Sequence, residues 1–236
     1  MQEFLHGAAM IILYLIPMAL LALTARKLIK IPDELFRKIL HFILLGTYIP
    51  LITSFENGWM ASGFSALFII ILYPLLTAAE KIPAFASFIN QRRSGEIRNS
   101  MILAFSMMAL SALVCWGFLG DRYLVLACVY AWGVGDAFAA LIGKQFGRHK
   151  IKMKFADHKK SMEGSAAFLV TSAIAVWIVL VIRGGIGVFG CMLIAVAAAT
   201  AAMFVELCTK DGYDTFTCPA AAMVVILPLI HLFGGY

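Results

Sequence analysis

Long apolar stretches dominate this sequence and restrict the chain to a membrane-spanning fold. Eight of them are expected to form helices, over residues 5–26, 38–54, 58–79, 100–119, 122–143, 162–182, 186–206 and 216–234. A helix needs about 20 predominantly apolar residues to cross a hydrocarbon core. The chain is 62% hydrophobic over 236 residues, which leaves no length for a soluble domain of ordinary size. We therefore predict one integral membrane domain, residues 1–236, folded as an all-α polytopic transmembrane helical bundle.

Positive charge is strongly sorted along the chain. With the N-terminus outside, the loops 27–37, 80–99, 144–161 and 207–215 fall on the inner side. Counting helix ends, 17 of the 19 Lys and Arg residues then lie inside, in agreement with the positive-inside rule. We therefore expect eight spans with both termini on the outer side. The same rule accounts for the net charge of +6, so we do not expect nucleic acid as a partner.

Acidic residues gather on the same side, and Asp136 is the most informative of them. Ten of the 13 Asp and Glu residues lie inside or in helices near the inner face, which the positive-inside rule does not explain. If its helix ends near Gly143, Asp136 lies roughly 10 Å within the membrane. A carboxylate at that depth costs about 2.5–3.5 kcal/mol. It must be paired, hydrated or bound to a metal, although the small residues around it would also serve close helix packing.

The loop after this helix is strongly basic, with seven Lys and Arg residues from Lys144 to Lys160. One interpretation is a patch for anionic lipids. Another is a polyphosphate cradle, because the helix that begins after Ser161 offers free amides and a positive dipole end. The candidate nucleotide-binding residues are Lys144, Arg148, Lys150, Lys159, Lys160, Ser161 and Gly164. Glu163 is a candidate Mg²⁺ ligand, or it simply favours the first turn of its helix.

Further polar residues stand at the ends of other spans. Arg37, Lys38 and His41 open the second span, either as interfacial anchors or as residues that shape a site. Glu206 ends the seventh span and Asp214 precedes the eighth, and both are candidate site acids. Glu96 is a weaker candidate, because charged residues are common in loops. The set therefore spreads over most of the chain but converges on one predicted face.

Carboxylates and bases on one inner face suggest a particular chemistry. Carboxylates hold Mg²⁺ together with substrate phosphates, and basic residues neutralise the charge that moves during phosphoryl transfer. A nucleotide would come from the aqueous side and a lipid from the membrane. The pattern thus predicts transfer of a phosphorus group between a nucleotide and a lipid. A transporter or scaffold for anionic lipids is the alternative, but it does not explain the acids, and transporter sites lie nearer the midplane.

Three motifs resemble those of the membrane lipid-alcohol kinases, the family of dolichol kinase, phytol kinase and CTP-dependent diacylglycerol kinase. The central motif is GDAFAALIGKQFGRHK at 135–150, followed by KKSMEG at 159–164. RKILH at 37–41 is similar to the early Arg-Lys-x-x-His motif of the family. Glu206 and DTFTCP at 214–219 are similar to its late motif, with Thr215 where the family usually has Asn.

This resemblance implies a CTP-dependent, Mg²⁺-dependent kinase that phosphorylates the hydroxyl of an isoprenoid alcohol or diacylglycerol at the cytoplasmic face. By analogy, Asp136 would bind nucleotide-bound Mg²⁺, with Glu163 as the second candidate ligand, and Lys160 would hold phosphates. Asp136 and Glu206 are the candidates to take the proton of the hydroxyl. Asp136, Lys160 and Glu206 are therefore the predicted catalytic residues.

The central motif is also similar to that of phosphatidate cytidylyltransferase, which makes CDP-diacylglycerol. There KKTWEG replaces KKSMEG, and the enzyme ends in a segment containing Pro-Gly-His-Gly-Gly. No such segment follows Glu206 here, so we rank the kinase first. Grooves for farnesol, a long polyprenol or diacylglycerol look alike in sequence, and the acceptor is assigned only as a class.

Overall fold

The computed structural model describes residues 2–81, 95–151, 160–209 and 212–235, and most of these residues are helical. Helical segments appear in the order α1 (Gln2–Leu28), α2 (Asp33–Gly46), α3 (Tyr48–Ser54), α4 (Gly58–Ala79), α6 (Glu96–Ser111), the π-helical turn η1 (Ala112–Phe118), α7 (Arg122–Phe146), α8 (Met162–Arg183), α9 (Val188–Cys208) and α10 (Asp214–Leu232). No strand occurs within the described ranges. The all-α fold predicted from the sequence is confirmed.

The eight predicted membrane spans are also confirmed. Within the described residues, eight helical stretches are long and apolar enough to cross a membrane. Two of these stretches join consecutive segments, since α2 continues into α3 and α6 continues into η1. The second span begins at Asp33, five residues before the predicted start. Asp33 and Glu34 lie in its first turn, where the helix dipole favours negative charge.

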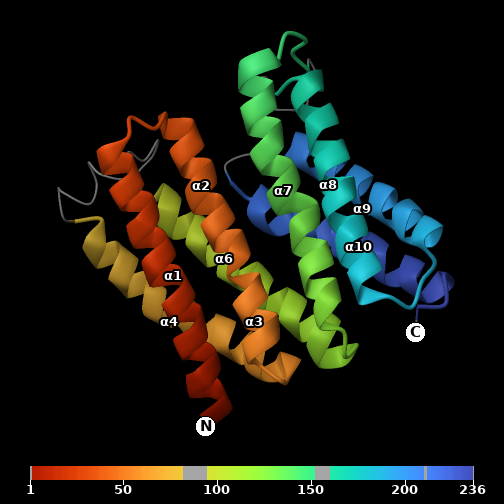
Figure 1. Cartoon of the computed structure of the whole chain (residues 1–236), viewed down its shortest axis with the longest axis horizontal. Helices are drawn as coiled ribbons and strands as arrows, with labels where there is room; N and C mark the ends of the chain where they lie inside the picture. The colour runs from red at the N-terminus through yellow and green to blue at the C-terminus, as the bar shows by residue number, and fades with distance from the viewer. Residues whose placement is uncertain (1, 82–94, 152–159, 210–211, 236) are drawn as a thin grey trace.

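Helix α7 lies between α2 and α8 in the middle of the bundle (Figure 1), and it is the most buried span. Small residues allow its neighbours to approach closely. A side chain at Gly133 would overlap Leu45 of α2, and one at Gly135 would overlap Ser172 of α8. The backbone around Gly164 of α8 also lies close to α7. The glycines near Asp136 thus have a packing role on both sides of α7.

The outer surface of the bundle is rich in apolar side chains, as contact with lipid requires. Many large apolar side chains are exposed, including Leu13, Ile70 and Val224, which are 67%, 69% and 70% exposed. Such extensive apolar exposure is rare on a soluble monomer. The α1–α2 turn and the α7–α8 connection lie at the same end of the bundle, away from the N-terminus (Figure 1). This matches the predicted sorting of loops, while the orientation of the termini across the membrane stays a prediction.

Candidate functional site

The centre of the candidate site is an ion pair between α2 and α7. The Nζ atom of Lys38 lies 2.6 Å from Oδ2 of Asp136. The two side chains are only 13% and 19% exposed, so the pair is largely removed from solvent. A carboxylate in the membrane requires a partner, and Lys38 supplies it.

His41 reinforces this contact from the next turn of α2. Its Nε2 atom is 2.9 Å from the carbonyl oxygen of Gly133 and 4.0 Å from Oδ2 of Asp136. Residues three apart share a helix face, so Lys38 and His41 both point to α7. The absence of a side chain at Gly133 leaves room for Leu45 on the same face of α2. This close approach explains why the two polar side chains of α2 reach Asp136.

Trp132 connects the pair to α10. Its indole Nε1–H donates to Oδ2 of Asp214 over 3.3 Å. The edge of its ring system packs against His41, with ring centroids 4.8 Å apart and planes at 75°. Trp132 lies one turn before Asp136 on α7 and is nearly fully buried. Sequence reasoning did not single out this residue, although the i, i+4 spacing to Asp136 was a usable signal.

A second ion pair joins the start of α8 to the end of α9. The Nζ atom of Lys160 lies 2.8 Å from Oε1 of Glu206. It also donates to the backbone carbonyl of Glu206 and, over 3.4 Å, to that of Thr209. These carbonyls belong to the C-terminal end of α9, where a cation is favoured by the helix dipole. Lys160 therefore connects the start of α8 to the end of α9, and it places a positive charge between them.

The two ion pairs belong to one electrostatic unit, which we call the charged cluster. Asp136 interacts with the charge of Lys160 as well as that of Lys38. Glu206 and Asp214 each experience the negative charge of Asp136. The members of the charged cluster are Lys38, His41, Asp136, Lys160, Glu206 and Asp214. The three motifs, far apart in sequence, thus supply side chains to one region of the bundle.

The two ends of the basic α7–α8 connection pair with each other through backbone contacts. Lys150 pairs with Ser161 in an isolated antiparallel bridge, and the amide of Ile151 donates to the carbonyl of Lys160 over 3.0 Å. Lys144, Arg148 and Lys150 are exposed. The described part of the loop therefore offers its basic side chains to solvent beside the charged cluster. Lys159 lies outside the described residues.

Ser161 and Gly164 have clear local roles at the start of α8. The hydroxyl of Ser161 is buried and caps the helix by accepting from the amide of Gly164 over 3.2 Å. A Cβ at Gly164 would lie 3.0 Å from the carbonyl oxygen of Ala139 and 3.3 Å from Cα of Gly143. Both residues thus hold α8 against α7. Their predicted contacts with a nucleotide stay predictions.

Glu163 and Arg37 contact residues outside the charged cluster. The Glu163 carboxylate is 2.7 Å from Nδ1 of His149 and accepts from the His149 amide over 3.2 Å. Arg37 approaches Glu34 to 4.0 Å, and the same carboxylate is 3.9 Å from Lys144. The Lys144 contact connects the end of α7 to the start of α2, and the His149 contact connects the α7–α8 loop to the start of α8. Glu96 begins α6, but its side chain lies outside the described residues.

The predicted metal ligands Asp136 and Glu163 are well separated along the bundle. Gly143 faces Gly164 across the α7–α8 contact, and Asp136 lies seven residues before Gly143, roughly 10 Å along the axis. Within the described part of the chain, no three His, Cys, Asp or Glu side chains are grouped so as to hold a metal ion. The acids that share the electrostatic environment of Asp136 are Glu206 and Asp214.

The fold and the charged cluster together define a polytopic helical membrane protein with a polar site enclosed between its spans. Comparison with known proteins shows what this chain is similar to. The chain is 25% identical to a phytol kinase of Synechocystis over an aligned stretch that covers 94% of this chain and 91% of that protein. It is 28% identical to the dolichol kinase EVAN of Arabidopsis thaliana over a stretch that covers 64% of this chain and 27% of that protein. These similarities support membership of the lipid-alcohol kinase family.

No family model matches the chain, and no solved structure matches it. Support for the lipid-alcohol kinase family therefore comes from the three motifs and from the similarity to these two kinases.

Proposed function

We propose that this protein transfers the γ-phosphate of CTP to the hydroxyl of a membrane lipid alcohol, with Mg²⁺, at the cytoplasmic face. The observation that carries the proposal is the charged cluster, in which lysines and carboxylates meet between membrane spans. Phosphoryl transfer depends mainly on positioning and on neutralising phosphate charge. The names of the two relatives, phytol kinase and dolichol kinase, support a lipid alcohol as acceptor.

Four members of the charged cluster have a chemical task in this proposal. Lys38 and Lys160 neutralise phosphate oxygens, and Lys38 exchanges the Asp136 carboxylate for a phosphate when the nucleotide binds. The alcohol oxygen forms a bond to the γ-phosphorus while the bond from that phosphorus to the β-phosphate oxygen breaks. The hydroxyl proton leaves to a carboxylate, for which Asp136 and Glu206 are the candidates. The products are a lipid monophosphate and CDP.

The donor set suits a magnesium ion. Mg²⁺ prefers oxygen ligands and is usually held by one or two carboxylates together with substrate phosphates. Asp136 would hold it, and the ion would supply charge neutralisation at the phosphates. Glu163 stays a predicted second ligand. Its carboxylate contacts His149 of the α7–α8 connection.

The basic loop supports a nucleotide that enters from the aqueous side. Lys144, Arg148 and Lys150 are exposed beside the cluster and would attract a triphosphate before it reaches Lys160. The choice of CTP over other nucleotides rests on the family resemblance. Competition between CTP and ATP in the transfer reaction tests it directly.

The decisive experiment uses the purified protein in vesicles with CTP labelled at the γ-phosphate. Phytol, a long polyprenol and diacylglycerol are offered separately as acceptors. We expect Mg²⁺-dependent label in a lipid monophosphate and none with Asp136→Asn, a variant that keeps the shape of the side chain. If no lipid alcohol accepts label, the kinase is refuted, and pyrophosphate release with phosphatidate would identify a cytidylyltransferase instead.

A further inference from the structure

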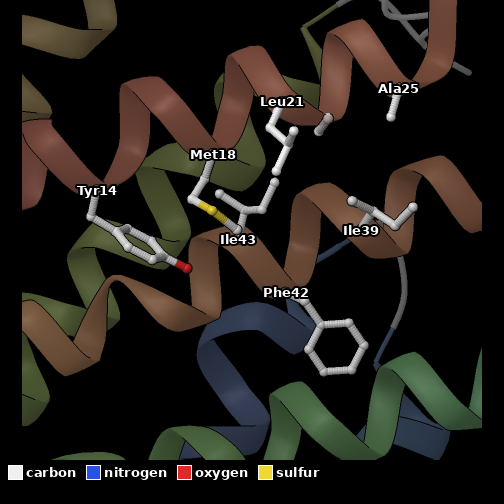
Figure 2. A pocket seen from close by; sticks show the side chains of 8 residues that line it. Tyr14, Met18, Leu21, Ala25, Ile39, Phe42 and Ile43 are labelled. Carbon is white, nitrogen blue, oxygen red and sulfur yellow. The ribbon is translucent and has the colours of Figure 1, made fainter. Parts of the chain in front are cut away.

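Helix α2 presents two different faces to its neighbours. On the side of α1, Ile39 and Ile43 line an apolar groove between the two helices (Figure 2). On the side of α7, Lys38 and His41 contact residues of α7. Glu34 lies one turn before Lys38, and residues four apart share a helix face. The face of α2 that meets α7 therefore carries an acid in addition to the two polar side chains of the charged cluster.

Charged contacts between α2 and α7 occur at two levels. At the deeper level Lys38 pairs with Asp136. At the other level Glu34 approaches Lys144, which lies eight residues after Asp136, roughly 12 Å further along α7. The start of α2 and the end of α7 both lie at the end of the bundle that holds the α7–α8 connection (Figure 1). An anion that approaches through this basic connection therefore meets Glu34 before it reaches Lys38.

The Glu34 carboxylate lies close to two cations. Its Oε2 atom is 4.0 Å from Nη1 of Arg37 and 3.9 Å from Nζ of Lys144. The Glu34 side chain is only 15% exposed, whereas those of Arg37 and Lys144 are 33% and 70% exposed. A largely buried carboxylate thus attracts two more exposed cations at the place where α2 and α7 meet the basic loop.

These two contacts are looser than the ion pairs of the charged cluster. The cluster pairs are 2.6 and 2.8 Å long, which are distances typical of charge-assisted hydrogen bonds. The contacts of Glu34 at 3.9 and 4.0 Å are longer than a hydrogen bond. Long, partly exposed ion pairs contribute little stability. Arg37 and Lys144 can therefore exchange this carboxylate for a stronger anionic ligand at little cost.

We propose that Glu34 is an internal anion that competes with the phosphates of the incoming nucleotide for Arg37 and Lys144. The inference rests on the proposed kinase function and adds an affinity-determining residue to its nucleotide site. A polyphosphate carries several negative charges, so it displaces the singly charged carboxylate from the two cations. Glu34 remains nearby after this exchange, and its charge repels the bound phosphates. It therefore limits the affinity for CTP and promotes the release of CDP.

The test removes the charge of Glu34 while keeping the shape of its side chain. In Glu34→Gln we expect the KM for CTP to fall about fivefold, the upper end of what a partly exposed ion pair contributes, while kcat changes little. Damage to the fold would not improve nucleotide binding, so a lower KM distinguishes this role from a structural one. A KM that rises would overturn the proposal and assign Glu34 to holding the two cations in place.

Two further variants separate competition for these cations from a general change in charge. Asp33→Asn is the matched control, because it removes the same charge from the neighbouring residue, which pairs with Arg26 of α1. Its KM for CTP should equal that of the wild type. In a Lys144→Met background, Glu34→Gln should lower the KM less than it does in the wild type, because one of the contested cations is missing. An equal fall in Asp33→Asn would overturn the specific role of Glu34.

Calorimetric titration with inorganic tripolyphosphate provides a readout that does not need phosphoryl transfer. The full-length protein is titrated in detergent micelles without a lipid acceptor. We expect Glu34→Gln to bind tripolyphosphate more tightly than the wild type does, and Glu34→Ala serves as a second variant should the first fold poorly. Unchanged or weaker binding in both variants would overturn the proposal and leave the kinase intact. Tighter binding in a protein that phosphorylates no alcohol would refute the kinase and leave Glu34 as a residue that limits anion binding.

Discussion

The Nζ atom of Lys38 lies 2.6 Å from Oδ2 of Asp136, and this ion pair joins α2 to α7 across 98 residues of sequence. Neither side chain could stay charged at this depth without the other, because an unpaired charge among membrane helices is strongly unfavourable. The pair therefore has two consequences. It holds α2 against α7, and it keeps a charged carboxylate between the spans, where the proposed reaction needs one.

Removal of Lys38 should show both consequences. Lys38→Met leaves Asp136 without its partner, and loss of one member of a buried ion pair typically costs about 3–5 kcal/mol. Because the two side chains are 13% and 19% exposed, we expect a loss near the lower end of that range, seen as a lower unfolding temperature in detergent. The double variant Lys38→Met, Asp136→Leu should regain stability but have no kinase activity. A stable and fully active Lys38→Met variant would contradict this role.

Lys160 should act mainly on nucleotide binding. Charge-assisted hydrogen bonds contribute about 1.5–3 kcal/mol, so Lys160→Met should raise the KM for CTP on the order of 10–100-fold. Lys144→Met is the matched control, since Lys144 is 70% exposed and its contact with Glu34 is long, at 3.9 Å. Exposed pairs contribute little, and this variant should change the KM for CTP much less. Equal effects of the two variants would argue for a diffuse basic patch.

Trp132 should position the site without touching the nucleotide. Trp132→Phe removes the Nε1–H donor to Asp214 but keeps an aromatic ring beside His41. We expect kcat to fall about tenfold, the loss of one hydrogen bond to a carboxylate, with the KM for CTP unchanged. Trp59→Phe, at an exposed position on α4, is the control and should behave as wild type. A rise in the KM for CTP equal to the fall in kcat would refute a positioning role.

The sequence predicted the spans well because each one is a local property of the chain. A run of about 20 apolar residues can satisfy its backbone only as a helix in the membrane. The second span was harder, since Asp33 and Glu34 begin the helix outside the apolar run. Charge at the first turn is favoured by the helix dipole and is not part of the hydropathy signal.

The site was predictable as a set of residues but not as a set of contacts. Asp136, Glu206 and Asp214 stood out because acids in or beside membrane spans need a reason. That Lys38 pairs with Asp136, and Lys160 with Glu206, depends on which helices pack together, which spacing along the chain does not encode. Trp132 was overlooked because a tryptophan in an apolar span looks like an ordinary core residue.

Close packing of α7 on α8 provides the last prediction. A Cβ at Gly135 would overlap Oγ of Ser172, which donates to the carbonyl of Ala131 over 2.5 Å. It would also lie 2.9 Å from the ring of Phe168. Overpacking of this kind costs about 1–3 kcal/mol, so Gly135→Ala should lower the unfolding temperature. It should also reduce activity, because any shift of α7 moves Asp136 relative to Lys38.

Gly63→Ala is the matched control for this substitution, within α4. An added Cβ at Gly63 meets nothing within 4 Å, and alanine is favoured over glycine in a helix by about 1 kcal/mol. The unfolding temperature of Gly63→Ala should therefore stay the same or rise, with activity unchanged. If Gly135→Ala also left the unfolding temperature and the activity unchanged, α7 and α8 would have room to move apart. The depth and pairing of Asp136 would then not depend on the contact between these two helices.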